Sequence, residues 1–112
     1  MTESDGCAIL FARFTEAGYA ITRNFHFREG DIEVDLDGWD AAARVGFEYL
    51  TAEAGDHHQF DPPTLGRFEA RMEKHELFVL LVDELDAVTE AELDGAARAF
   101  LVEIASRRGG TR

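Results

Sequence analysis

The chain has 112 residues and a formal net charge of −12, and 46% of its residues are hydrophobic while 30% are charged. This length and balance predict one globular domain over residues 1–112, with a single core. The negative charge would repel a phosphate backbone, which argues against direct nucleic-acid binding and favours cations or a basic protein partner.

The first predicted element is a helix from about Ser4 to Ala17, which Gly18 ends. Apolar residues recur there at the helical spacing i, i+3, i+4, i+7: Cys7, Leu10, Phe11 and Phe14. Cys7 is the one cysteine, so no intramolecular disulfide can form, and we expect a buried structural thiol. The acidic residues 1–6 are unlike a signal peptide, so a cytoplasmic protein is expected.

A β-hairpin is predicted next, because the apolar period changes to two after Tyr19. A two-residue turn at Glu29-Gly30 would place Phe27 opposite Ile32 on one face of the hairpin. The second apolar pair would be Phe25 with Val34, and the other face would pair Arg28 with Asp31, His26 with Glu33, Asn24 with Asp35, and Thr22 with Asp37. Residues 44–51 form a third strand, with Glu48 on the side opposite Val45, Phe47 and Tyr49.

The remaining elements alternate helix, strand and helix after a polar loop over residues 52–61. Asp61 caps a second helix that begins with Pro62, residues 77–82 form a central strand, and Thr89 with Glu92 forms a capping box for the last helix. Residues 106–112 are expected to be a frayed tail. The sequence thus predicts an α+β fold of order α-β-β-β-α-β-α, in which an antiparallel three-stranded meander and a fourth strand pack with helices. The apolar stretch 77–82 is too short to span a membrane, and at a sheet edge it would favour homo-oligomers.

The candidate functional feature is an acidic face on this hairpin. Alternate residues of one strand carry the carboxylates Asp31, Glu33, Asp35 and Asp37. Glu48 is expected to project to the same side from the third strand, close to Glu33 or Asp35. Trp39 would either be an aromatic anchor at the rim or fold back on the core. A solvated sheet face is one interpretation. The functional interpretation is a non-enzymatic module, such as an immunity protein, inhibitor or adaptor, that binds a basic protein through Glu33, Asp35, Asp37, Trp39 and Glu48, with no cofactor.

The alternative interpretation is a metal-dependent phosphodiesterase in which Asp35 and Glu48 bind Mg²⁺ or Mn²⁺. The element order, with acids on the second and third strands, is similar to the PD-(D/E)XK nuclease fold. That resemblance implies that Asp35 or Asp37 and Glu48 bind the metal. Leu50 occupies the position of the family's lysine, which implies a member without activity. Asp56 and His57 in the polar loop are a weaker candidate metal pair.

Overall fold

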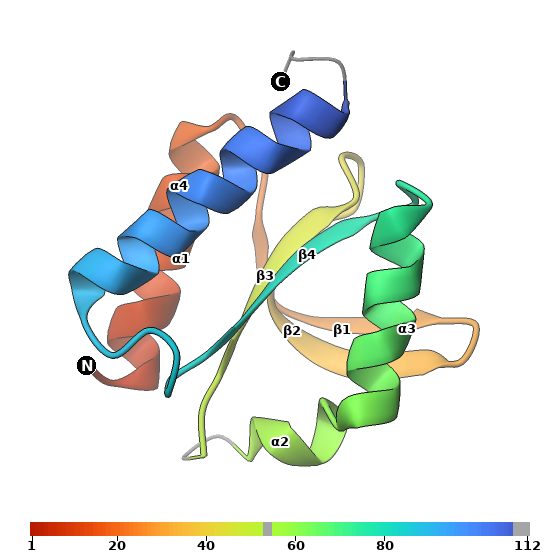
Figure 1. Cartoon of the computed structure of the whole chain (residues 1–112), viewed down its shortest axis with the longest axis horizontal. Helices are drawn as coiled ribbons and strands as arrows, with labels where there is room; N and C mark the ends of the chain where they lie inside the picture. The colour runs from red at the N-terminus through yellow and green to blue at the C-terminus, as the bar shows by residue number, and fades with distance from the viewer. Residues whose placement is uncertain (53–54, 109–112) are drawn as a thin grey trace.

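The structure is a computed structural model that describes residues 1–52 and 55–108, and the backbone alone of His57 (Figure 1). The elements in chain order are α1 (Glu3–Glu16), β1 (Thr22–Glu29), β2 (Ile32–Asp40), β3 (Val45–Leu50), α2 (Asp56–Gln59), α3 (Pro62–Glu73), β4 (Phe78–Asp83) and α4 (Glu90–Arg107). The predicted α+β fold and its order of principal elements are confirmed. The residues expected to form a polar loop include a single helical turn, α2.

The four strands form one mixed sheet in the order β1-β2-β3-β4. β2 is antiparallel to both β1 and β3, as the meander requires, whereas β4 is parallel to β3. β4 lies at the edge of the sheet and not at its centre as predicted, and its residues are apolar because helices cover both of its faces. Figure 1 shows α1 and α4 side by side on one face of the sheet and α3 on the opposite face. Within the described part of the chain, no helix is both long and apolar enough to cross a membrane.

The core has two parts because both faces of the sheet are covered. The part under α1 and α4 includes Leu10, Phe14, Phe47, Leu93 and Ile104, and none of these side chains is exposed. The part under α3 includes Phe27, Val34, Leu36, Trp39 and Phe68. The amphipathic stripes of the helices therefore meet the sheet as their spacing predicts.

The hairpin register differs from the predicted one by two residues. Phe27 pairs with Val34 and His26 with Asp35, and Glu29 pairs with Ile32, so the turn is formed by residues 30 and 31. Gly30 has a φ of 58°, a backbone conformation that glycine adopts without strain. Because side chains alternate with a period of two, this shift keeps Phe27, Ile32 and Val34 together on the predicted apolar face.

Glu29 explains why the turn moves. Its carboxylate accepts two hydrogen bonds from Arg44, at 2.7 and 2.9 Å, and one from Arg71 at 3.1 Å. These contacts keep Glu29 in the strand and join the hairpin to β3 and α3. The side chains of Arg44 and Glu29 are both partly exposed, and the two parallel hydrogen bonds of this forked pair fix their relative orientation.

The end of the chain also departs from the sequence prediction. Residues 106 and 107, assigned to a frayed tail, belong to the last turn of α4, where the Arg107 side chain donates to Glu103 at 2.9 Å. Arg108 lies over the Phe78 ring at 4.9 Å. The rest of the predicted tail, residues 109–112, lies outside the described residues.

Replacing Phe68 with alanine should lower the free energy of unfolding by about 3–5 kcal/mol, because it leaves a cavity against the Phe27 and Phe60 rings. Urea unfolding followed by Trp39 fluorescence measures this loss. Val102→Ala is the control, because Val102 is 70% exposed and its truncation should change stability by less than about 0.5 kcal/mol. Equal losses in the two variants would contradict the assignment of Phe68 to the core.

Candidate functional site

The candidate site lies where β2 and β3 separate. Their ladder consists of the pairs Asp40–Val45, Trp39–Gly46 and Gly38–Phe47. Past that last pair, β2 continues beside β1 while β3 continues beside β4. Figure 1 shows the β1–β2 hairpin turning away from β3 and β4 at this point. Backbone groups at the opening therefore need partners other than the neighbouring strand.

Two acidic side chains supply those partners. The Asp37 amide donates to Glu48 Oε1 at 2.8 Å, and the Tyr49 amide donates to Asp37 Oδ2 at 2.8 Å. Each carboxylate thus replaces a backbone carbonyl of the missing ladder. This reciprocal exchange fixes both carboxyl groups in the sheet rather than on its solvated surface.

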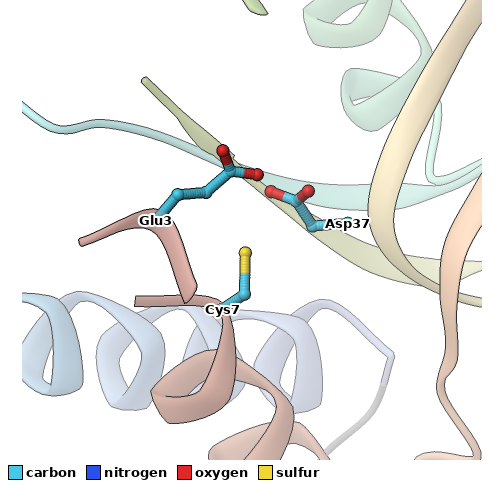
Figure 2. Close-up of side chains that lie close together, drawn as sticks. All are labelled: Glu3, Cys7 and Asp37. Atoms are coloured by element: carbon cyan, nitrogen blue, oxygen red, sulfur yellow. The ribbon is translucent and has the colours of Figure 1, made fainter. Parts of the chain in front are cut away.

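Side chains from two helices complete the cluster. Glu3 and Cys7 lie one turn apart in α1 and face β2, and the ligand atoms of Glu3, Cys7 and Asp37 lie within 4.8 Å of one another (Figure 2). The Thr51 hydroxyl donates to Glu3 at 3.2 Å, and the Thr51 amide donates to Asp56 of α2 at 3.1 Å. Four acids and a thiol thus converge on the opening between β2 and β3.

Glu48 has the most unusual environment of these groups. The residue is 1% exposed, and its Oε2 atom is buried without a hydrogen-bond partner. Burial, followed by the negative charges of Asp37 and Asp56, raises the pKa of Glu48 to about 11. The metal-free protein therefore holds this side chain as the neutral acid at neutral pH.

The pKa values of the neighbouring Cys7 and Asp37 are also raised. Burial raises the pKa of the Cys7 thiol, and the adjacent Asp37 carboxylate raises it further. Burial also raises the pKa of Asp37, although the hydrogen bonds from the Tyr49 amide and the Cys7 thiol partly oppose that change. These shifts show a region of excess negative potential that favours bound protons or a bound cation.

A hollow of about 360 Å³ opens from this cluster to solvent. Its lining residues are Glu3, Asn24, Asp35, Leu36, Asp37, Gly55, Asp56 and Gln59. Four of these residues are acidic, and no lysine or arginine is among the described residues that line it. The hollow is therefore suited to a positively charged group.

The outer carboxylates of the hairpin lie beside this hollow and are exposed. His26 lies between two of them, with Nδ1 at 2.7 Å from Asp35 and Nε2 at 2.8 Å from Glu33. The Gln59 amide group also donates to Asp35, at 2.9 Å. Hydrogen bonds to Asp35 and then to Glu33 raise the pKa of His26, and the bond from His26 is the main reason that the pKa of Asp35 is lowered. Asp31 lies nearer the turn, 3.1 Å from Arg67.

The structure changes the expected acidic face at two residues. Glu48 was expected on the solvated face close to Glu33 or Asp35, but it is buried and bonded to the Asp37 backbone. Of the two interpretations of Trp39, packing on the core is the one observed, because the residue is 2% exposed with its ring against Phe27. The alternation of polar and apolar residues does not indicate where two strands of a sheet separate. The carboxyl groups that bond to the backbone at this opening were therefore predicted to be surface charges.

The nuclease-type pair is only partly assembled. Asp35 pairs with His26 and Gln59 at the surface, whereas Asp37 is the acid of β2 that meets Glu48. Asp56 of the weaker pair joins the cluster through Thr51, and the side chain of His57 lies outside the described residues. No protein-family model, curated protein or solved structure matches the chain.

Sequence reasoning missed the contribution of α1. Glu3 was taken as part of an acidic N-terminus, and Cys7 as an inert core thiol. Their i, i+4 spacing places both side chains on one face of the helix, and this signal was present in the sequence. What the sequence lacked was the position of that face against Asp37.

Glu48→Gln should make stability less dependent on pH. The folded-state pKa of Glu48 is about 11 and its ordinary value is 4.5, so between these values unfolding releases a proton. Rising pH therefore destabilises the native chain, whereas the glutamine variant keeps the acceptor for the Asp37 amide and has no proton to lose. From about pH 6 to about pH 8 the variant should gain roughly 1 kcal/mol per pH unit relative to the native chain.

Urea unfolding with a chelator present measures this difference. Glu33→Gln is the matched control, because Glu33 is exposed and its neutralisation should not change the trend in this way. Parallel pH profiles for the native chain and Glu48→Gln would show that Glu48 is ionised in the folded state.

Proposed function

We propose that this protein is a non-enzymatic interaction module that binds a basic protein partner at the acid-lined hollow and the exposed hairpin carboxylates. The observation that carries the proposal is the hollow itself, because Glu3, Asp35, Asp37 and Asp56 line it together. An arginine or lysine side chain is the protein group that matches such a pocket in charge and hydrogen bonding.

The exposed carboxylates support the same proposal by their accessibility. The side chains of Glu33 and Asp35 are 56% and 62% exposed, so a partner can reach them without unfolding the hairpin. A net charge of −12 would also steer a basic partner to the protein. Charge of this kind acts mainly on the association rate and on its salt dependence.

His26 acts as an internal competitor for these carboxylates. Its ring contacts both Glu33 and Asp35, and its raised pKa favours the charged form in that position. A guanidinium group of the partner would take the same place, with more donors in a planar fork. Removal of the imidazole should therefore expose the two carboxylates to the partner.

The paired substitutions Glu33→Lys and Asp35→Lys should slow association with the partner about tenfold or more at low salt, with a smaller effect at high salt. His26→Gln should have the opposite effect and speed association. The measurement is the association rate by surface plasmon resonance at two salt concentrations, with a partner first captured by affinity purification and then purified.

Glu69→Lys with Glu73→Lys is the matched control. Both residues are exposed on α3, on the opposite face from α1, and the pair changes the net charge equally. If the control slows binding as much as the hairpin pair does, net charge alone would explain binding and the proposed surface would be wrong.

A further inference from the structure

The buried end of the acidic cluster contains a cysteine sulfur, which the binding of an arginine or lysine side chain would not require. Glu3, Cys7 and Asp37 offer two carboxylate oxygens and one sulfur within 4.8 Å of one another (Figure 2). Glu3 and Cys7 come from one face of α1 and Asp37 from β2 at the opening in the sheet, so two elements position the three groups. A small cation would meet ligands already in position.

The unpartnered oxygen of Glu48 is a second and independent sign of a missing ligand. Glu48 Oε1 is fixed by the Asp37 amide, which leaves Oε2 buried with no N–H or hydroxyl donor and with another acid, Asp56, as its hydrogen-bonding neighbour. Two facing carboxyl groups need a proton or a cation between them. Buried polar atoms without partners are rare in native proteins. A cation or a shared proton at the cluster would satisfy this oxygen.

The sulfur selects the kind of cation. Mg²⁺ and Ca²⁺ prefer oxygen ligands alone, whereas Zn²⁺ accepts cysteine sulfur together with carboxylate oxygen in tetrahedral sites. Cys7 itself is 7% exposed, but Glu3 and Asp37 also line the hollow and provide a route from solvent. We propose that Glu3, Cys7 and Asp37, with Glu48 next to Asp37, form a binding site for a thiophilic divalent metal ion such as Zn²⁺.

Binding at this site displaces protons. The Cys7 thiol loses its proton to solvent as the sulfur–metal bond forms, and the positive ion lowers the thiol pKa that the surrounding acids raise. Glu48 loses its proton for the same reason. The metal therefore neutralises a region that otherwise requires protonation.

The metal site shares Glu3 and Asp37 with the hollow of the partner surface that we propose, but each site also has residues of its own. Cys7 does not line the hollow, so Cys7→Ser tests metal binding alone, whereas Glu33 and Asp35 lie outside the metal cluster and are the exposed groups that a partner would contact. Metal binding can therefore fail while partner binding holds, and the reverse.

Co²⁺ titration of the chelator-treated, reduced 112-residue chain tests this proposal directly. A thiolate-to-cobalt charge-transfer band in the near ultraviolet and visible bands of tetrahedral cobalt are expected, and Zn²⁺ should abolish both. Cys7→Ser should remove the charge-transfer band and weaken Zn²⁺ binding by at least the ~10–100-fold that loss of an outer-shell partner causes. Asp37→Asn, which can still accept from the Tyr49 amide, should also weaken binding.

Glu3→Gln provides a second ligand variant that leaves the core unchanged and the Thr2–Asp5 capping box intact, and circular dichroism verifies the fold of each variant. His26→Gln is the control for zinc bound by surface imidazole, and it should keep the cobalt spectrum. Absence of the charge-transfer band, or equal Zn²⁺ affinity of Cys7→Ser and the native chain, would overturn the proposal. Binding of Mg²⁺ but not Zn²⁺ would also overturn it, and Glu48 would then be satisfied by a shared proton or by an oxygen-only site.

Discussion

The exchange of hydrogen bonds between Asp37 and Glu48 allows one sheet to serve two cores. Where β2 leaves β3, the two carboxyl groups accept from the Asp37 and Tyr49 amides in place of the missing strand partners. The hairpin can then turn over α3, while β3 and β4 stay beneath α1 and α4 (Figure 1). Because carboxyl groups form this junction, negative charge is concentrated at the centre of the fold.

That concentration is costly for folding, which makes it informative about function. A buried carboxyl group loses its hydration, and like charges beside it add to the penalty. Serine or threonine could supply an acceptor for an amide without that penalty. The hydrogen-bonding role of Asp37 and Glu48 therefore does not by itself require carboxylates, whereas attraction of a cation does. Acidic residues therefore extend from the exposed Asp35, through the hollow, to the cluster of Glu3 and Asp37 beside α1.

Much of the fold follows from local sequence patterns, because amphipathic periods, caps and turns act over a few residues. The helix stripes, the Asp61 and Thr89 caps and the faces of the hairpin were all predicted correctly. The register was wrong by two residues because Glu29 is held by Arg44 and Arg71, which are distant in sequence. Glu48 was misplaced because alternation assumes a continuous sheet, and Trp39 was assigned to a loop although it belongs to β2. The Glu3–Cys7–Asp37 cluster depends on tertiary packing, so the helical spacing alone indicated only half of it.

Glu48 lies buried among negative charges, and we propose that it stays neutral until a cation binds. Carbon-13 NMR of the side-chain carboxyl groups tests this claim at a single atom, by comparison of the Glu48 shift in metal-free protein with its shift after Zn²⁺ is added. We expect a protonated Glu48 carboxyl at neutral pH that becomes ionised on addition of zinc, while the shift of the exposed Glu33 carboxyl, which lies outside the cluster, does not respond to zinc. An ionised Glu48 carboxyl in the metal-free protein at neutral pH would contradict it.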